Sequence, residues 1–257
     1  MNLLTIIVLA VFVIFILIGY SRGLFRSIFK LLLAGISLVV AYLCTPLIAS
    51  AIIEYTPIDE YVNEKVYEGV ENIARDRVKK ELGENVEQVS DEVVDGLTEI
   101  ALGIEPNRNQ QVEIIKQLKL PTFMTDALIT NNNDDVRSEL GADGFYRYLA
   151  YYISYMIINA GAFIVTFTLI NLLANVIYIA LGIVSKLPII GGIDKLGGLL
   201  LGGVEALLIA WIILIVISMF ANTDIGNHLY TQVNESSFLT FLHDHNIFNK
   251  VIVNIGK

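Results

Sequence analysis

The sequence predicts an all-α, polytopic membrane protein with four transmembrane helices in two hairpins and a helical extracytoplasmic insert between the hairpins. Composition is the first reason, because 55 % of the 257 residues are hydrophobic. The second is that the long apolar runs lack the polar face of a water-exposed helix. The third is a strongly acidic segment that separates the second run from the third. The runs are Leu3–Ile18, Ile28–Ile53, Tyr152–Val184 and Leu196–Phe220.

Run length supports this class, since a helix needs roughly 20 apolar residues to cross the hydrocarbon core. Three runs reach that length, and the first does so when it extends through Gly19 and Tyr20. No basic side chain precedes the first run and no small-residue cleavage site follows it. We therefore expect a first span with an external N-terminus, and not a removable signal peptide.

The segment between the hairpins holds 21 of the 26 acidic residues and 10 of the 17 basic ones. Its apolar residues recur at intervals of three to four, which predicts amphipathic helices packed into a loose cap. Its strong negative charge argues against a nucleic-acid partner. The tail predicts short amphipathic helices on the external membrane face. The expected units are 1–53 (first hairpin), 54–150 (insert), 151–220 (second hairpin) and 221–257 (tail).

The short connections set the expected orientation. Residues 19–27 and 185–195 are both basic, and short basic loops stay in the cytoplasm. The N-terminus, the insert and the tail are then external. An aromatic cluster next to the third run suits side chains that anchor a helix at the membrane interface. It comprises Phe145, Tyr146, Tyr148, Tyr151, Tyr152 and Tyr155.

A basic stripe is expected at the start of the second span. Arg22, Arg26 and Lys30 are spaced by four residues, with Gly23 beside the first of them. On one helix, that spacing places all three cations on the same face. The stripe either anchors the topology or binds anionic lipid headgroups or an acidic cytoplasmic partner.

Small residues form a strip along the fourth span, at Gly198, Gly202, Ala206 and Ala210. A small residue every four positions lets two membrane helices approach backbone to backbone. The strip predicts tight packing within the chain or, as the alternative, homo-oligomerisation or a pore lining.

Glu205 is the one acidic residue inside an apolar run. A charge in the membrane is costly unless it is paired, protonated or hydrated, which makes Glu205 a functional candidate. Asn175 lies at a similar depth on the third span, and Asn171 shares its face. The two alternatives are an ion or proton path along this seam, and a protonated Glu205 hydrogen-bonded to Asn175.

No enzyme is predicted. The sequence lacks a nucleophile elbow, a phosphate loop, a dinucleotide fingerprint and a zinc-protease motif, and no cofactor is expected. Its single cysteine, Cys44, excludes an internal disulfide. His243 and His245 are two residues apart, so on a helix they point in different directions, and we expect solvated side chains and no metal site.

Two short motifs resemble signatures of one bacterial family. Arg22-Gly23-Leu24-Phe25-Arg26 opens the second span, and Asp194-Lys195-Leu196-Gly197-Gly198 followed by Gly202-Gly203 opens the fourth. Their order and placement are similar to the colicin V production protein family, and the two hairpins that carry them make up about half of the chain. The insert is longer than the loop typical of that family, as in Gram-positive versions. Glu205-Ala206 stands where the family often has a basic residue and glycine.

The resemblance implies a four-span bacterial plasma-membrane protein, without established catalysis, that is associated with toxin production or export and envelope homeostasis. Its expected partners are the bilayer, an unknown protein and a second copy of the chain. The alternative is a small oligomeric channel with a polar path between the third and fourth spans, and a weaker one is a sensor whose cap binds a ligand.

Overall fold

A computed structural model describes residues 2–83, 89–180, 191–221 and 223–253. These residues form helices joined by short connections, and they contain no strand. The elements are α1 (Leu3–Arg22), α2 (Leu24–Tyr55), α3 (Ile58–Leu82), α4 (Asp91–Gly103), α5 (Arg108–Gln117), α6 (Thr122–Thr130), α7 (Asp134–Glu139), α8 (Phe145–Ala180), α10 (Gly191–Met219), α11 (Asp224–Asn234), α12 (Ser237–Asp244) and α13 (Asn249–Val253).

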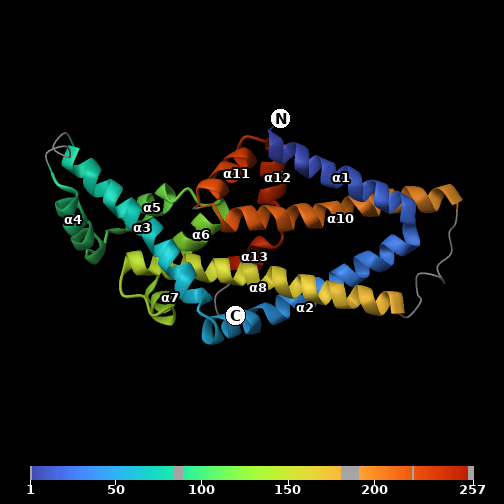
Figure 1. Cartoon of the computed structure of the whole chain (residues 1–257), viewed down its shortest axis with the longest axis horizontal. Helices are drawn as coiled ribbons and strands as arrows, with labels where there is room; N and C mark the ends of the chain where they lie inside the picture. The colour runs from blue at the N-terminus through green and yellow to red at the C-terminus, as the bar shows by residue number, and fades with distance from the viewer. Residues whose placement is uncertain (1, 84–88, 181–190, 222, 254–257) are drawn as a thin grey trace.

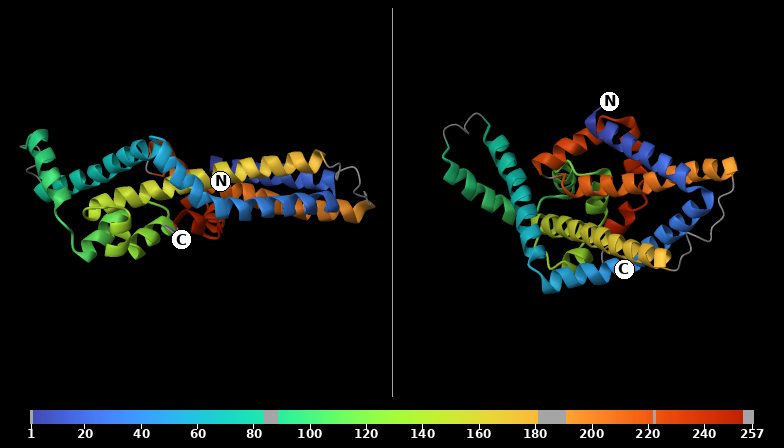
Figure 2. Two further views of the ribbon diagram at one scale, coloured as in Figure 1. Left: turned by 90° about the horizontal axis from the view of Figure 1, so that it is seen from below. Right: turned by 45° about the vertical axis from the view of Figure 1, so that its right-hand side comes forward.

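Four of these helices, α1, α2, α8 and α10, are long and apolar enough to cross a membrane, as the sequence predicted. They run side by side, with α1 against α10 and α2 against α8 (Figures 1 and 2). The turn between α1 and α2 lies at one end of this bundle. The N-terminus, the acidic helices and the tail lie at the other end (Figure 1).

The turn between α1 and α2 is a single residue, Gly23, with a φ of +83°. An L-residue with a side chain rarely adopts this φ, whereas glycine does so without a steric penalty. The α2 helix begins directly at Leu24. The second expected turn lies partly outside the described residues, and the described part of 185–195 already belongs to α10, which begins at Gly191.

The cap is built around the first half of α8, with α3, α5 and α6 packed on it. Four of the six aromatic side chains predicted to anchor α8 at the membrane interface, Phe145, Tyr146, Tyr148 and Tyr152, are instead part of this core, whereas Tyr151 and Tyr155 are half-buried. Phe145, Tyr148 and Tyr152 are fully buried. The Tyr148 hydroxyl donates to the Leu128 carbonyl at 2.8 Å, and the Tyr152 hydroxyl donates to the Val253 carbonyl at 3.1 Å. These rings supply the apolar volume that the aliphatic residues of the cap lack.

The expected boundaries at 53/54 and 150/151 both fall inside continuous helices. The α2 helix extends to Tyr55, and α8 begins at Phe145 and continues into the bundle. The α8 helix contains no proline that would separate its cap half from its membrane half, and its glycine, Gly161, does not interrupt it. The cap is therefore joined to the bundle by one uninterrupted helix, α8.

The tail packs on the bundle through part of its apolar surface, a contact that the sequence did not predict. Buried side chains of α11 and α12 join those of α1 and α10 in one cluster that includes Leu4, Leu214 and Leu239. The Trp211 indole Nε1 donates to the Leu242 carbonyl at 3.0 Å. The Asn2 side-chain amide donates to the Gln232 carbonyl at 2.6 Å.

The side chain of His243 was expected to be solvated, and this is wrong, because only 4 % of the residue is exposed. Its Nε2 lies 3.2 Å from the Ser218 hydroxyl and its Nδ1 lies 3.3 Å from an Asp244 carboxylate oxygen. The rings of Phe123 and Tyr230 pack beside it. No group of three or more metal-binding side chains occurs in the described part of the chain.

His243 predicts acid sensitivity of the tail. Burial lowers the pKa of His243 below its ordinary value, against the opposing effect of Asp244. The unfolded chain then binds a proton more readily, so stability is complete above about pH 6.5 and falls as the pH drops below it. Thermal denaturation of purified protein between pH 7 and pH 5 should show this loss. A His243→Gln variant should lose less over the same range, and equal losses in the two proteins would contradict the prediction.

Candidate functional site

A partly open cavity of about 180 Å³ lies between the spanning helices. Each of the four contributes at least one polar side chain, and the first and last of these, Arg22 and Glu205, are 183 positions apart in the sequence. The polar side chains are Arg22 from α1, Lys30 from α2, Asn171 and Asn175 from α8, and Glu205 from α10. The rest of its lining is apolar: Phe15, Ala34, Phe167, Leu208, Ile209 and Ile212. The structure thus brings together most of the polar residues selected from the sequence.

Glu205 pairs with Arg22. The Arg22 Nη1 donates to both Glu205 carboxylate oxygens, at 2.9 and 2.8 Å, and the two side chains are 23 % and 13 % exposed. A charge-assisted hydrogen bond of this kind is stronger than one between neutral groups. The described residues make no hydrogen bond between Glu205 and Asn175, which was one of the alternatives expected from the sequence. Asn175 instead donates to the carbonyl and side-chain oxygens of Asn171, at 2.7 and 3.0 Å.

The basic stripe does not form as expected, because its three cations belong to two helices. Arg22 is the last residue of α1, and the turn at Gly23 separates it from Arg26 and Lys30 on α2. Arg22 points to Glu205, whereas no carboxylate of the described residues lies within 4.0 Å of Arg26 or Lys30. Arg22 is therefore neutralised, whereas Arg26, outside the cavity, and Lys30, in its lining, lack an ion pair in this part of the chain.

The small-residue strip faces α1 of the same chain. A Cβ atom added to Gly198 would lie 2.8 Å from the Gly23 carbonyl carbon, and one added to Gly202 would lie 3.0 Å from the Ile16 Cα. Ala206 and Ala210 continue the strip and are fully buried. Because this face is covered by α1, the geometry favours packing within the chain over the alternative of contact between copies.

The two sequence motifs meet at the turn. The Asp194 side chain accepts hydrogen bonds from the backbone N–H of Leu24 at 2.8 Å and of Phe25 at 3.4 Å. These are among the free donors at the start of α2, so a buried acid from α10 caps the helix in place of a local residue. The Lys195 ammonium lies 5.6 Å from the centre of the Tyr20 ring. Sequence reasoning found both motifs but missed their contact.

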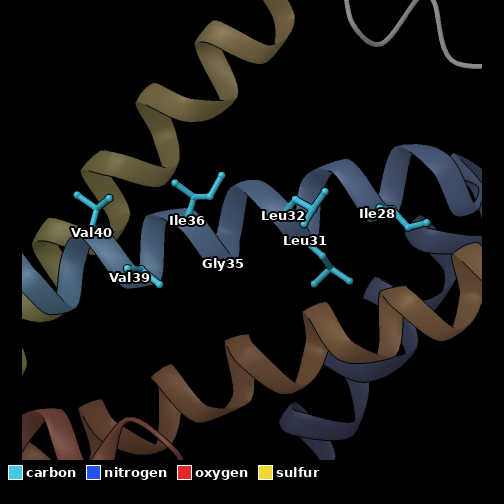
Figure 3. Close-up of a pocket in the computed structure, with 7 residues that line it drawn as sticks. All are labelled: Ile28, Leu31, Leu32, Gly35, Ile36, Val39 and Val40. Atoms are coloured by element: carbon cyan, nitrogen blue, oxygen red, sulfur yellow. The ribbon is translucent and has the colours of Figure 1, made fainter.

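A second hollow runs along the outside of α2. It is shallow and open to the outside, with a volume of about 660 Å³. Figure 3 shows the apolar side chains that line it. Its lining comes from one helix: Ile28, Leu31, Leu32, Gly35, Ile36, Val39 and Val40. It begins two residues after Arg26. An apolar groove on a spanning helix is suited to contact with hydrocarbon chains.

The comparisons with known proteins agree with this architecture. No curated protein and no solved structure matches the chain significantly. One family model, described as colicin V production protein, matches residues 4–72 and 140–246. The match covers all four spanning helices and both motifs, and it leaves out most of the acidic insert. The chain is a multi-pass membrane protein that belongs to the colicin V production protein family.

Proposed function

We propose that this protein is a non-catalytic plasma-membrane component that supports toxin or bacteriocin production or export, and envelope homeostasis, by docking a protein partner on its acidic cap. The observation that carries the proposal is an exposed apolar ridge on α4. Val93, Leu97 and Ile100 are 52 %, 37 % and 62 % exposed, and Ile104 just beyond the helix is 61 % exposed. Their spacing places them on one helical face.

The ridge is held in position from its other side. Val94 and Thr98 are buried on the flank of α4 that meets α3. Arg75 of α3 pairs with Asp91 at 3.2 Å and with Asp95 at 2.9 Å. The helix is therefore anchored to the cap while its apolar ridge stays open, at the end of the molecule far from the bundle (Figure 1).

Charge specifies the partner that suits this ridge. The α4 helix contains four acidic residues and no basic one, and Glu92 and Glu99 lie exposed along the ridge. A cationic amphipathic helix complements this surface, because its apolar face covers the ridge and its cations meet the carboxylates. An anionic membrane surface does not complement it. We place the cap, the N-terminus and the tail outside the cell, because the turn at the other end of the bundle is basic.

The test uses cells that produce a bacteriocin and carry a photo-crosslinking residue at position 100. We expect adducts with a protein through a cationic amphipathic helix. Ile100→Glu should reduce secreted bacteriocin by at least about tenfold, because a buried carboxylate costs several kcal/mol in such an interface. Gln117→Glu is the matched control, since it adds the same charge to the exposed side of α5. Adducts only with lipid or a second copy, or undiminished secretion, would refute the docking role.

The polar cavity favours a second candidate, a small channel or transporter. All four spanning helices line it with side chains that interact with water or ions. Current recordings in planar bilayers under membrane tension should then show discrete conductances that change in Glu205→Gln. A folded protein without currents across ionic conditions would rule out this candidate.

A further inference from the structure

The cavity between the spanning helices has an excess of positive charge. Two cationic side chains, Arg22 and Lys30, and one carboxylate, Glu205, line it. Arg22 is paired with Glu205, whereas Lys30 makes no hydrogen bond or ion pair in the described part of the chain. A partly buried ammonium group among apolar side chains is costly while it lacks a partner of opposite charge. The cavity therefore favours an anion beside Lys30.

The unused hydrogen-bond donors of the cavity indicate the same class of ligand. The Lys30 ammonium group carries three N–H donors and no acceptor. Among the described residues the Asn171 Nδ2 donates to nothing, since only the oxygens of Asn171 are engaged, by Asn175. Both Glu205 oxygens already accept from Arg22. Free donors therefore predominate, which suits an anion and not a metal cation.

Helix geometry brings these donors to one place. Asn171 and Asn175 are four residues apart on α8, and Lys30 and Ala34 are four residues apart on α2, so each pair extends from one helical face. The volume of about 180 Å³ is the space of several water molecules. A small anion that keeps part of its water fits this space.

We propose that this cavity binds one small monovalent anion, of the size of chloride or nitrate, with Lys30 as its charged partner and Asn171 as a neutral donor. One negative charge is what the cavity lacks, because Glu205 already balances Arg22. A divalent anion would leave one of its charges unpaired and lose more hydration. The site specifies an ion for the channel candidate, on which a role in conduction rests, but binding itself needs no conduction and no docking on the cap.

The experiment measures chloride binding to purified protein by broadening of the chloride NMR line, with nitrate and sulfate as competitors. We expect saturable broadening that nitrate removes and sulfate does not. Lys30→Gln should weaken chloride binding at least about tenfold, as loss of one hydrogen bond to a charged group predicts. Glu205→Gln should strengthen binding, because Arg22 is then no longer neutralised. Lys195→Gln is the matched control, since it removes a cation outside the cavity lining and should leave binding unchanged.

A second variant separates charge from folding. Lys30→Arg keeps the cation and should retain binding, and thermal denaturation shows that each variant is folded. Equal chloride binding in folded Lys30→Gln, or no saturable broadening in the native protein, would overturn the proposal. Displacement of chloride by phosphatidylglycerol in the micelles, but not by nitrate, would overturn the free anion in favour of a lipid phosphate. Chloride binding without currents in bilayers would support the anion site and rule out only the channel candidate.

Discussion

Replacing Arg22 by leucine is expected to destabilise the protein by about 3 kcal/mol or more, because the Glu205 carboxyl group then loses its partner inside the bundle. Removing both partners, with Arg22→Leu and Glu205→Leu, should cost much less, since neither charge remains. Unfolding in mixed micelles with increasing denaturing detergent measures the four free energies, for the native protein, Arg22→Leu, Glu205→Leu and the double variant. The resulting double-mutant cycle isolates the pair from the packing of each side chain.

Lys30→Leu is the matched control, because Lys30 lines the same cavity without a carboxylate within 4.0 Å in the described chain. It should be tolerated far better than Arg22→Leu. Similar losses in these two variants, or additive losses in the double variant, would show that the Arg22–Glu205 contact contributes nothing to stability.

Gly202→Ala is expected to be one of the most damaging single-methyl changes in the bundle, with a loss of about 3 kcal/mol. The new Cβ would meet the backbone of α1, at the Phe15 carbonyl and 3.0 Å from the Ile16 Cα. A backbone cannot rotate away as a side chain can, so α1 and α10 must separate. Thermal denaturation in detergent, followed by loss of the monodisperse protein, measures the effect.

Gly203→Ala is the neighbouring control. Its added Cβ would lie 3.9 Å from the Ile16 Cγ1, an ordinary contact, so this variant should retain native stability. If Gly202→Ala leaves the melting temperature unchanged but alters the oligomeric state, the strip mediates contacts between copies. That result would contradict the conclusion that these glycines serve to pack α10 on α1.

The spans and the motifs could be predicted from sequence because they depend on local properties, namely the length of apolar runs and the spacing of charges or small residues. The partner of Glu205 could not. A depth estimate compares backbone positions, and it selected Asn175 on that basis. Arg22 is the last residue of α1, but its long side chain reaches back along the helix into the bundle, where it contacts Glu205. The contact depends on the length of the arginine side chain and on which helices are neighbours.

The aromatic residues at the start of α8 show a different limit. Tyrosine suits both a membrane interface and a protein core with one polar partner, because its ring is apolar and its hydroxyl hydrogen-bonds. Tyr148 and Tyr152 lie in the core, because each hydroxyl finds a carbonyl partner there. The partner of Tyr148 is Leu128 of the cap, and that of Tyr152 is Val253 of the tail. The same applies to His243, whose burial depends on the tail folding back onto α10. Neither placement is encoded in local sequence.

The continuity of α8 has a mechanical consequence. At 36 residues it is about 54 Å long, and its outer half is clamped in the cap core while its inner half ends beside the turn. Such a helix acts as a lever with its fulcrum at the membrane surface. A partner that tilts the cap by about 5° displaces the opposite end, about 27 Å from the middle of the helix, by about 2 Å. That end carries Asn171 and Asn175, which line the cavity. A movement of the cap is thereby transmitted along α8 to the opposite end of the bundle.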